Sequence, residues 1–125
     1  MSTVVAPSET VLLDELEQDD ELTKDLMKAR ELIRKGWVQH KMAQRNIFGH
    51  PKFCVLGSFN HVRRSDEYGQ LQMMRMFATA NNLHPQNIPA WNDHILRVHS
   101  HVLTAFDRAI ALARKRARKD SSRFA

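Results

Sequence analysis

Cys54 carries the most reactive side chain of this sequence and is its only cysteine. A catalytic cysteine acts as a thiolate, which a helix N-terminus, a nearby cation or a histidine base can stabilise. Seven histidines could supply that base, and Asn92 or Asp93 could orient its imidazole. The neighbours Phe53 and Val55 are apolar, however, and an apolar site favours the neutral thiol. We therefore expect Cys54 to be a buried, unreactive side chain, with a cysteine-dependent hydrolase as an alternative.

The histidines could also bind a metal ion, but their spacing does not favour it. Zinc ligands usually come in close pairs such as Cys-x-x-Cys or His-x-x-x-His, and neither pattern occurs here. His94 and His101 are seven residues apart and would share one side of a helix that began early enough. We expect no metal ion, no other cofactor and no catalytic residue.

A helix-turn-helix motif is a further alternative, because residues 38–43 resemble its first helix. The second helix of such a motif exposes polar side chains to base edges. The apolar segment from Phe53 to Phe59 offers almost none, and the turn lacks the glycine that is common there. We do not expect this motif to read DNA.

The net charge of +5 is distributed unevenly along the chain. The segment from Glu9 to Glu21 is acidic and contains no Lys or Arg, whereas the C-terminal end is basic. A basic run can bind phosphates, although no aromatic rings interleave with it to stack on bases. The alternatives are helix-dipole matching, pairing of the two ends within or between chains, and a solvated end. The residues expected to contact nucleic acid, if it binds, are Arg114, Lys115, Arg116, Arg118 and Lys119.

The composition predicts a folded helical domain. Hydrophobic residues make up 42% of the chain, enough for a core, and four glycines and four prolines are few for an all-β fold. A single cysteine does not point to an oxidising compartment. No apolar run approaches the roughly 18 residues of a membrane span, and no basic residue precedes an apolar block as in a signal peptide. We expect a cytoplasmic protein with no membrane partner.

Apolar residues recur every three or four positions in several segments, which is typical of amphipathic helices. The first clear segment spans residues 22–33, and Gly36 should end it in a left-handed conformation. Ser8 could cap a shorter helix that follows a disordered stretch at residues 1–7. Residues 38–44 should add another helical turn or two. The apolar stripe of the first clear segment is Leu22, Leu26, Ala29 and Ile33.

The segment from Phe53 to Val62 has almost no polar face and should be the central buried helix. Some of its residues favour strands, so a buried strand is an alternative, but no other segment could pair with it. Asp66 should cap the next helix, and Asn92 or Asp93 should cap the last one. The buried face expected for the Asp66 helix is Leu71, Met74, Phe77 and Ala78. That of the last helix is Ile95, Val98, Val102, Phe106, Ala109, Ile110 and Ala113.

These elements predict one all-α domain, a single compact bundle of four to six helices with a central apolar helix. The helical domain should span residues 8–113. Residues 114–125 should form a basic, frayed C-terminal end.

Four separated pieces of the sequence come in a recognisable order. They are Gly36-Trp37-Val38-Gln39, Cys54-Val55-Leu56-Gly57-Ser58, Trp91-Asn92-Asp93 and Phe106-Asp107-Arg108-Ala109. This order resembles a family of small uncharacterised helical domains of actinobacteria and their phages, over residues 22–113. Its pattern is Gly-Trp-x-Gln, Cys-x-x-Gly, Trp-Asn-Asp and Phe-Asp-x-Ala, with a small apolar residue where this chain has Ser58. The resemblance implies a fold class and a phage or actinobacterial context, but no catalytic residue.

Small size, charge asymmetry and this resemblance favour a non-enzymatic accessory protein, phage-encoded, that binds a host protein. Nucleic-acid binding through the basic end is the alternative, and a homo-oligomer is left open. The Trp-Asn-Asp piece combines a ring, an amide and a carboxylate, as a binding pocket would, although a helix cap over a packed ring has the same composition. The residues expected to contact a partner are Trp37, Gln39, Trp91, Asn92 and Asp93. The methionine-rich stretch from Met73 to Phe77 could offer another contact face or pack in the core.

Overall fold

The computed structural model describes residues 19–45 and 49–123. Within these ranges the helices are α2 (Glu21–Lys35), α3 (Val55–Val62), α4 (Glu67–Ala80), α5 (Ile88–Asn92) and α6 (His99–Arg123). A 3₁₀ helix, η1 (Pro85–Asn87), precedes α5, and the short strands β1 (Ala43–Gln44) and β2 (Lys52–Phe53) pair antiparallel. The predicted all-α class is confirmed. The predicted helix after Ser8 and the disordered residues 1–7 lie outside the described ranges.

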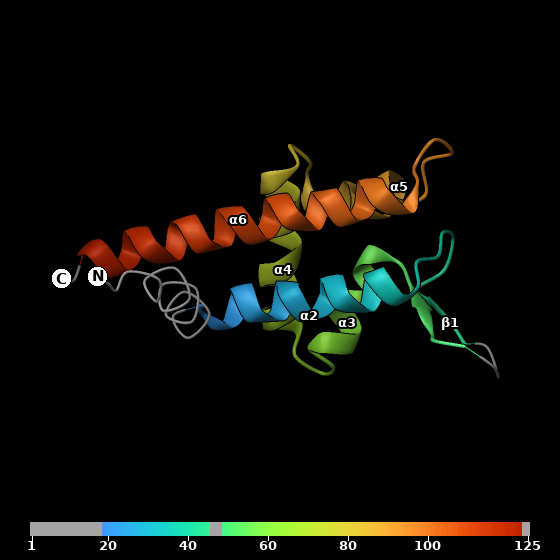
Figure 1. Cartoon of the computed structure of the whole chain (residues 1–125), viewed down its shortest axis with the longest axis horizontal. Coiled ribbons are helices and arrows are strands. Elements are labelled where there is room, and N and C mark those ends of the chain that lie inside the picture. Colours follow the sequence, from blue (N-terminus) through green and yellow to red (C-terminus); the bar gives the residue numbers. More distant parts are fainter. Residues whose placement is uncertain (1–18, 46–48, 124–125) are drawn as a thin grey trace, which may run out of the picture.

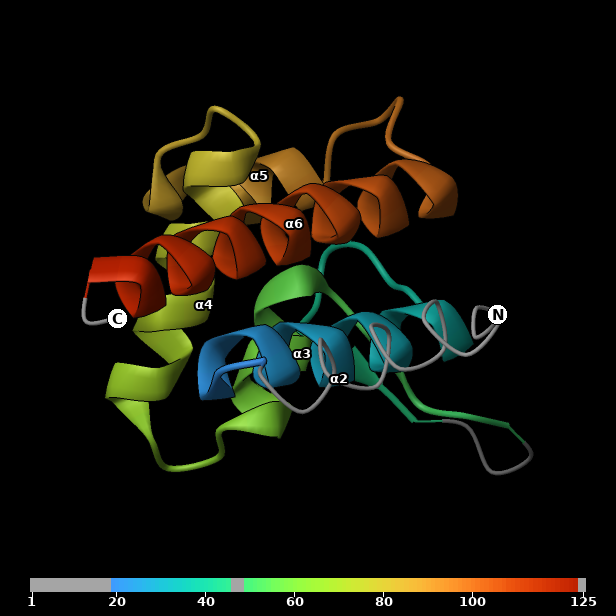
Figure 2. The ribbon, with the colours of Figure 1, turned by 60° about the vertical axis from the view of Figure 1, so that its left-hand side comes forward.

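Helices α2 and α6 run antiparallel, side by side, and α4 crosses behind them (Figure 1, Figure 2). Two ion pairs tie α6 to α2 and to the residues just before it: Arg30 Nε lies 2.7 Å from Asp107 Oδ1, and Arg114 Nη2 lies 3.1 Å from Asp19 Oδ2. Helix α3 packs against α2, α4 and α5. The apolar segment after Cys54 is therefore the central helix, as the sequence predicts. Among the described helices, none combines the length and the apolar character that a membrane span requires.

Three phenylalanines join α3, α4 and α6 at the centre of the core. Phe59, Phe77 and Phe106 are almost completely buried, and their rings meet edge to face with centroids 6.0, 5.8 and 5.2 Å apart. Such pairs contribute about 0.5–1.5 kcal/mol each beyond the burial of their area. This aromatic centre sets the packing of all three helices.

Helix α4 begins where the sequence predicts, but its buried face is rotated. The Asp66 carboxylate accepts the Gly69 backbone N–H at 2.9 Å and so caps the helix. Leu71 and Met74, predicted to be buried, are only half-buried. Because α4 packs against both α3 and α6, its buried side faces between them. The buried residues of α4 are Met73, Met76, Phe77 and Ala78.

Gly36 ends α2, but the predicted left-handed conformation is wrong. Its φ of −178° is extended backbone, which any residue adopts. Glycine is required there for space, since a Cβ would lie 2.9 Å from the Pro51 carbonyl oxygen and 2.9 Å from Lys52 Cγ. The chain leaving α2 therefore runs directly against the segment that leads into α3.

The helical turns predicted for residues 38–44 are also wrong. The Val38 N–H donates to the Phe53 carbonyl at 3.1 Å, and the Cys54 N–H donates to the Met42 carbonyl at 3.1 Å. These long-range backbone bonds pin the segment at Val38 and Met42, residues 39–42 bend between these points, and no first helix of a helix-turn-helix forms. Gly57 also faces this segment, because a Cβ there would collide with the Met42 carbonyl oxygen. The absence of a side chain at Gly57 therefore lets the backbone at Met42 approach α3 closely.

The last helix starts later than predicted. Neither Asn92 nor Asp93 caps it, since α6 begins at His99. Ile95 and Val98, predicted to be buried, are 90% and 49% exposed. Residues 93–98 form a loop, and the helix remains regular through Arg123, so residues 114–123 are helical. The buried face of α6 is Val102, Ala105, Phe106, Ala109, Ile110 and Ala113.

Candidate functional site

Asn92, at the end of α5, links three segments of the chain. Its side-chain oxygen accepts the Trp37 indole N–H at 2.9 Å and the Val55 backbone N–H at 3.1 Å. Its amide nitrogen donates to the Val38 carbonyl at 3.2 Å and to Asp93 Oδ1 at 2.9 Å. The residue is 1% exposed. All hydrogen-bonding capacity of the buried amide is therefore used within the protein.

Gln39 and His40 complete this network from the other side. Gln39 Nε2 donates to the carbonyls of Asn92 and His94, at 3.0 and 2.9 Å. The His40 backbone N–H donates to Asp93 Oδ1 at 2.9 Å, and this bond holds His40 at a left-handed φ of 67°. The segment after α2 and the turn after α5 are thus fastened together.

The same contacts shift the pKa of Asp93. Burial of the half-exposed carboxylate raises the pKa, but the hydrogen bonds from the His40 N–H and the Asn92 amide lower it more, together with the nearby His40 ring. The net result is a pKa below its ordinary value. Asp93 is therefore an anion at neutral pH.

The structure brings together all five residues that the sequence singled out for partner binding. Four of them, Trp37, Gln39, Asn92 and Asp93, take part in the network. Trp91 packs its ring edge-on against Phe77 with centroids 5.4 Å apart. The polar groups of these residues mainly bond to one another and to nearby backbone groups. The cluster therefore holds the neighbouring chain segments in place and offers few free polar groups to a partner. The exposed features next to it are a pocket and a loop.

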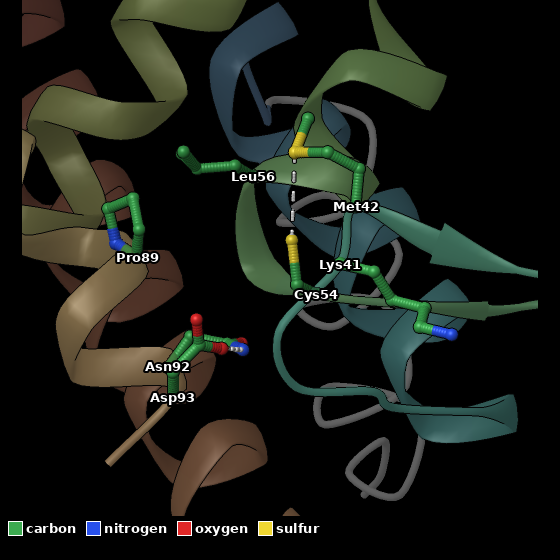
Figure 3. Close-up of a pocket in the computed structure, with 7 residues that line it drawn as sticks. All are labelled: Lys41, Met42, Cys54, Leu56, Pro89, Asn92 and Asp93. Atoms are coloured by element: carbon green, nitrogen blue, oxygen red, sulfur yellow. Dashed lines mark hydrogen bonds between the residues drawn. The ribbon is translucent and has the colours of Figure 1, made fainter.

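The pocket lies beside the cluster and has a volume of about 190 Å³. Cys54 lies in the wall of this pocket and caps α3. The Cys54 sulfur accepts the Gly57 N–H at 3.2 Å and lies 3.9 Å from Met42 Sδ. Burial raises the pKa of the Cys54 thiol, opposed by the Gly57 and Leu56 N–H groups. No histidine is among the described residues that line the pocket, so no base lies there to deprotonate the thiol, and the geometry favours the neutral form. The lining residues are Lys41, Met42, Cys54, Leu56, Pro89, Asn92 and Asp93 (Figure 3).

The loop that follows Asp93 exposes large apolar side chains. Ile95 is 90% exposed, Leu96 73% and Val98 49%. We call residues 94–98 the apolar loop. The sequence predicted Ile95 and Val98 to begin the buried stripe of the last helix, and nothing in their local spacing signals this exposure.

Hydrogen bonds fix the apolar loop from both sides. The His94 carbonyl accepts the Arg97 N–H at 2.9 Å as well as the Gln39 amide. Arg97 Nε donates to the Trp91 carbonyl at 2.9 Å, and its guanidinium lies 4.0 Å from the centre of the Trp91 ring. The exposed apolar side chains are therefore carried on a constrained backbone.

Comparison with known proteins assigns the chain to a family. A family model matches residues 17–112. The chain belongs to DUF6197, a family of unknown function. No curated protein and no solved structure matches the chain. The Asn92 network, the pocket and the apolar loop all lie within the DUF6197 segment.

The basic end begins beyond the DUF6197 segment, and its first arginine is used in the fold. Arg114 binds the Asp19 carboxylate through two hydrogen bonds of 3.1 Å, from Nε and Nη2. Asp19 is nearly buried, so this pair joins the two charged ends within one chain. The other residues named for nucleic-acid contact are exposed on α6: Lys115, Arg116, Arg118 and Lys119.

The DUF6197 segment offers no evident metal centre in its described part. Among residues 19–45 and 49–123, no three His, Cys, Asp or Glu side chains lie close enough to hold a metal ion. His94 and His101 instead accept backbone N–H groups, from Leu96 at 3.1 Å and Val98 at 3.4 Å. These two histidines shape the apolar loop.

Proposed function

We propose that this chain is a small non-enzymatic accessory protein that binds another protein through the apolar loop. The observation that carries the proposal is the exposure of Ile95 and Leu96 on a backbone that hydrogen bonds hold in place. Isolated exposed apolar residues are common, but a contiguous group on a constrained loop is typical of an interaction site.

The expected strength of such a contact follows from burial. Complete burial of one large aliphatic side chain contributes about 1.5–3 kcal/mol, so the Ile95 and Leu96 side chains together could contribute about 3–6 kcal/mol to binding. The constrained loop backbone reduces the ordering that association would otherwise require. These two residues are therefore suited to anchor an interface, whose other contacts must offset the remaining cost of association.

We further propose that this chain is phage-encoded and acts on a host protein in the cytoplasm. The resemblance of the four sequence pieces to small domains of actinobacteria and their phages motivates this biological context. The single cysteine cannot form a disulfide within the chain, which is compatible with a reducing compartment. The neutral, pocket-lining thiol supports a protein without cysteine catalysis.

The test is capture of partners from an actinobacterial lysate by the full chain, followed by quantitative mass spectrometry. The double variant Ile95→Asp/Leu96→Asp should lose a defined set of proteins that the wild type retains. Tyr68→Asp is the matched control, because Tyr68 is 73% exposed and lies on α4 in the pocket formed with the start of α2. Equal recovery by the wild type and the loop variant would contradict the proposal.

A second candidate function is nucleic-acid binding by the basic end. It is supported by the helical continuation of α6 through Arg123, which holds Lys115, Arg116 and Lys119 on exposed parts of one helix. The triple variant Lys115→Gln/Arg116→Gln/Lys119→Gln keeps the Arg114–Asp19 pair. It should bind DNA more weakly at low salt and reduce the salt slope of binding by about 0.9 per lost phosphate contact. An unchanged slope would argue against this function.

A further inference from the structure

We infer that the partner of the apolar loop presents an acidic segment whose large apolar side chain enters the pocket beside Cys54. This inference rests on the proposed function and specifies the partner's chemistry. It is based on the position of the pocket, the character of its walls and the charge of the surrounding chain segments.

The pocket and the apolar loop adjoin each other. Asp93 lines the pocket and directly precedes the loop, and Gln39 ties the loop to the segment that continues into Lys41 and Met42. Figure 1 shows the loop before α6, the segment after α2 and the strand pair at the same end of the molecule. A partner segment that covers Ile95 and Leu96 is therefore close to the pocket.

The pocket walls suit an apolar group. Met42, Leu56 and Pro89 supply apolar surface. Figure 3 shows the Leu56 side chain extending toward Pro89. The polar atoms of Asn92 are all bonded within the protein, and the Cys54 sulfur already accepts the Gly57 N–H. The volume of about 190 Å³ is suited to a single large side chain and is too small for a folded element.

The chain segments that form the pocket and the apolar loop carry more basic than acidic side chains, and the two charged residues that line the pocket itself are Lys41 and Asp93. Residues 36–54 contain no Asp or Glu, and in residues 81–106 Asp93 is the only acid. That carboxylate is already engaged by the His40 N–H and the Asn92 amide. The cationic side chains of these segments are Arg45, Lys41, Lys52 and Arg97. An acidic partner complements this charge, which accelerates association and makes it sensitive to salt.

The experiment selects random displayed peptides on the immobilised full chain. Enriched peptides should carry Asp or Glu beside Leu, Ile, Met or Phe. The affinity of these peptides for the protein should fall about tenfold or more in the Leu56→Trp variant, whose larger side chain fills the pocket. It should also fall in raised salt and stay unchanged in Tyr68→Asp. Bound peptide should also slow labelling of Cys54 by a small thiol reagent in the wild type, a readout that needs no variant.

Several outcomes would overturn the inference. These are enriched peptides without acidic residues, an absence of enrichment, and unaltered Cys54 labelling with peptide bound. A concentration-dependent dimer that Leu56→Trp abolishes would identify a second copy as the occupant instead. If Ile95→Asp/Leu96→Asp loses the captured protein while Leu56→Trp keeps it, the proposed function stands and this inference fails. If the loop variant keeps the captured protein, the proposed function fails.

Discussion

Replacing Asn92 by alanine should strongly destabilise the fold. The substitution removes the acceptor of the Trp37 indole and the Val55 N–H and the donor to the Val38 carbonyl. Val55 is completely buried, so leaving its N–H unpaired should cost about 1–3 kcal/mol. Trp37 and Val38 are half-buried and can partly regain bonds to water, so each lost bond should cost about 1 kcal/mol. The expected total is about 3–5 kcal/mol, a large part of the stability of a typical domain.

The assay is denaturant unfolding followed by circular dichroism. Asn87→Ala is the matched control, since Asn87 is exposed and its side chain makes no capping hydrogen bond. A double-mutant cycle with Trp37→Phe should show coupling of about 0.5–3 kcal/mol, because both changes remove the same bond. A loss below about 1 kcal/mol in Asn92→Ala, or a loss equal to that of Asn87→Ala, would refute the role assigned to this network.

Three further predictions concern other parts of the same region. Gly57→Ala should lower the unfolding midpoint sharply because its Cβ would collide with the Met42 carbonyl oxygen, whereas Gly49→Ala, with open space around it, should be neutral in the same melt. Asp93 has a lowered pKa in the folded state, so its stabilising contribution is present above its ordinary pKa of 3.8 and is lost as the pH falls through the lower folded value. Acid titration of stability should therefore be shallower in Asp93→Asn, and an unchanged curve would contradict this. Cys54 should react slowly with a thiol reagent at neutral pH and rapidly in denaturant, and fast native labelling would argue for a reactive thiolate.

Local signals in the sequence were reliable for α2 and for the start of α4. The stripe of α2 is buried at Leu26, Ala29 and Ile33, and the Asp66 cap forms as expected. Both depend on side chains that are at most one helical turn apart. The spacing of such a stripe and the cap of a helix are local, so they can be recognised in the sequence without knowing the rest of the fold.

The candidate site was predicted in part. The five residues chosen for partner binding do lie together, but the apolar loop and the pocket beside them were missed. Ile95 and Val98 match a helical period, and their exposure depends on where Asn92 and Asp93 are held. Those two side chains bond to residues 38–40, and Asn92 also bonds to Val55, so they cannot act as the cap of α6.

The sequence by itself determined the helical class, the central position of the segment after Cys54 and the charge at each end. The path of residues 38–44 and of the apolar loop was decided only by the tertiary structure. The bonds responsible connect residues far apart in the chain, 55 positions for Trp37 and Asn92 and 37 for Val55 and Asn92. Such bonds override local helical preference because leaving a buried polar group unpaired costs more than a few helical residues gain.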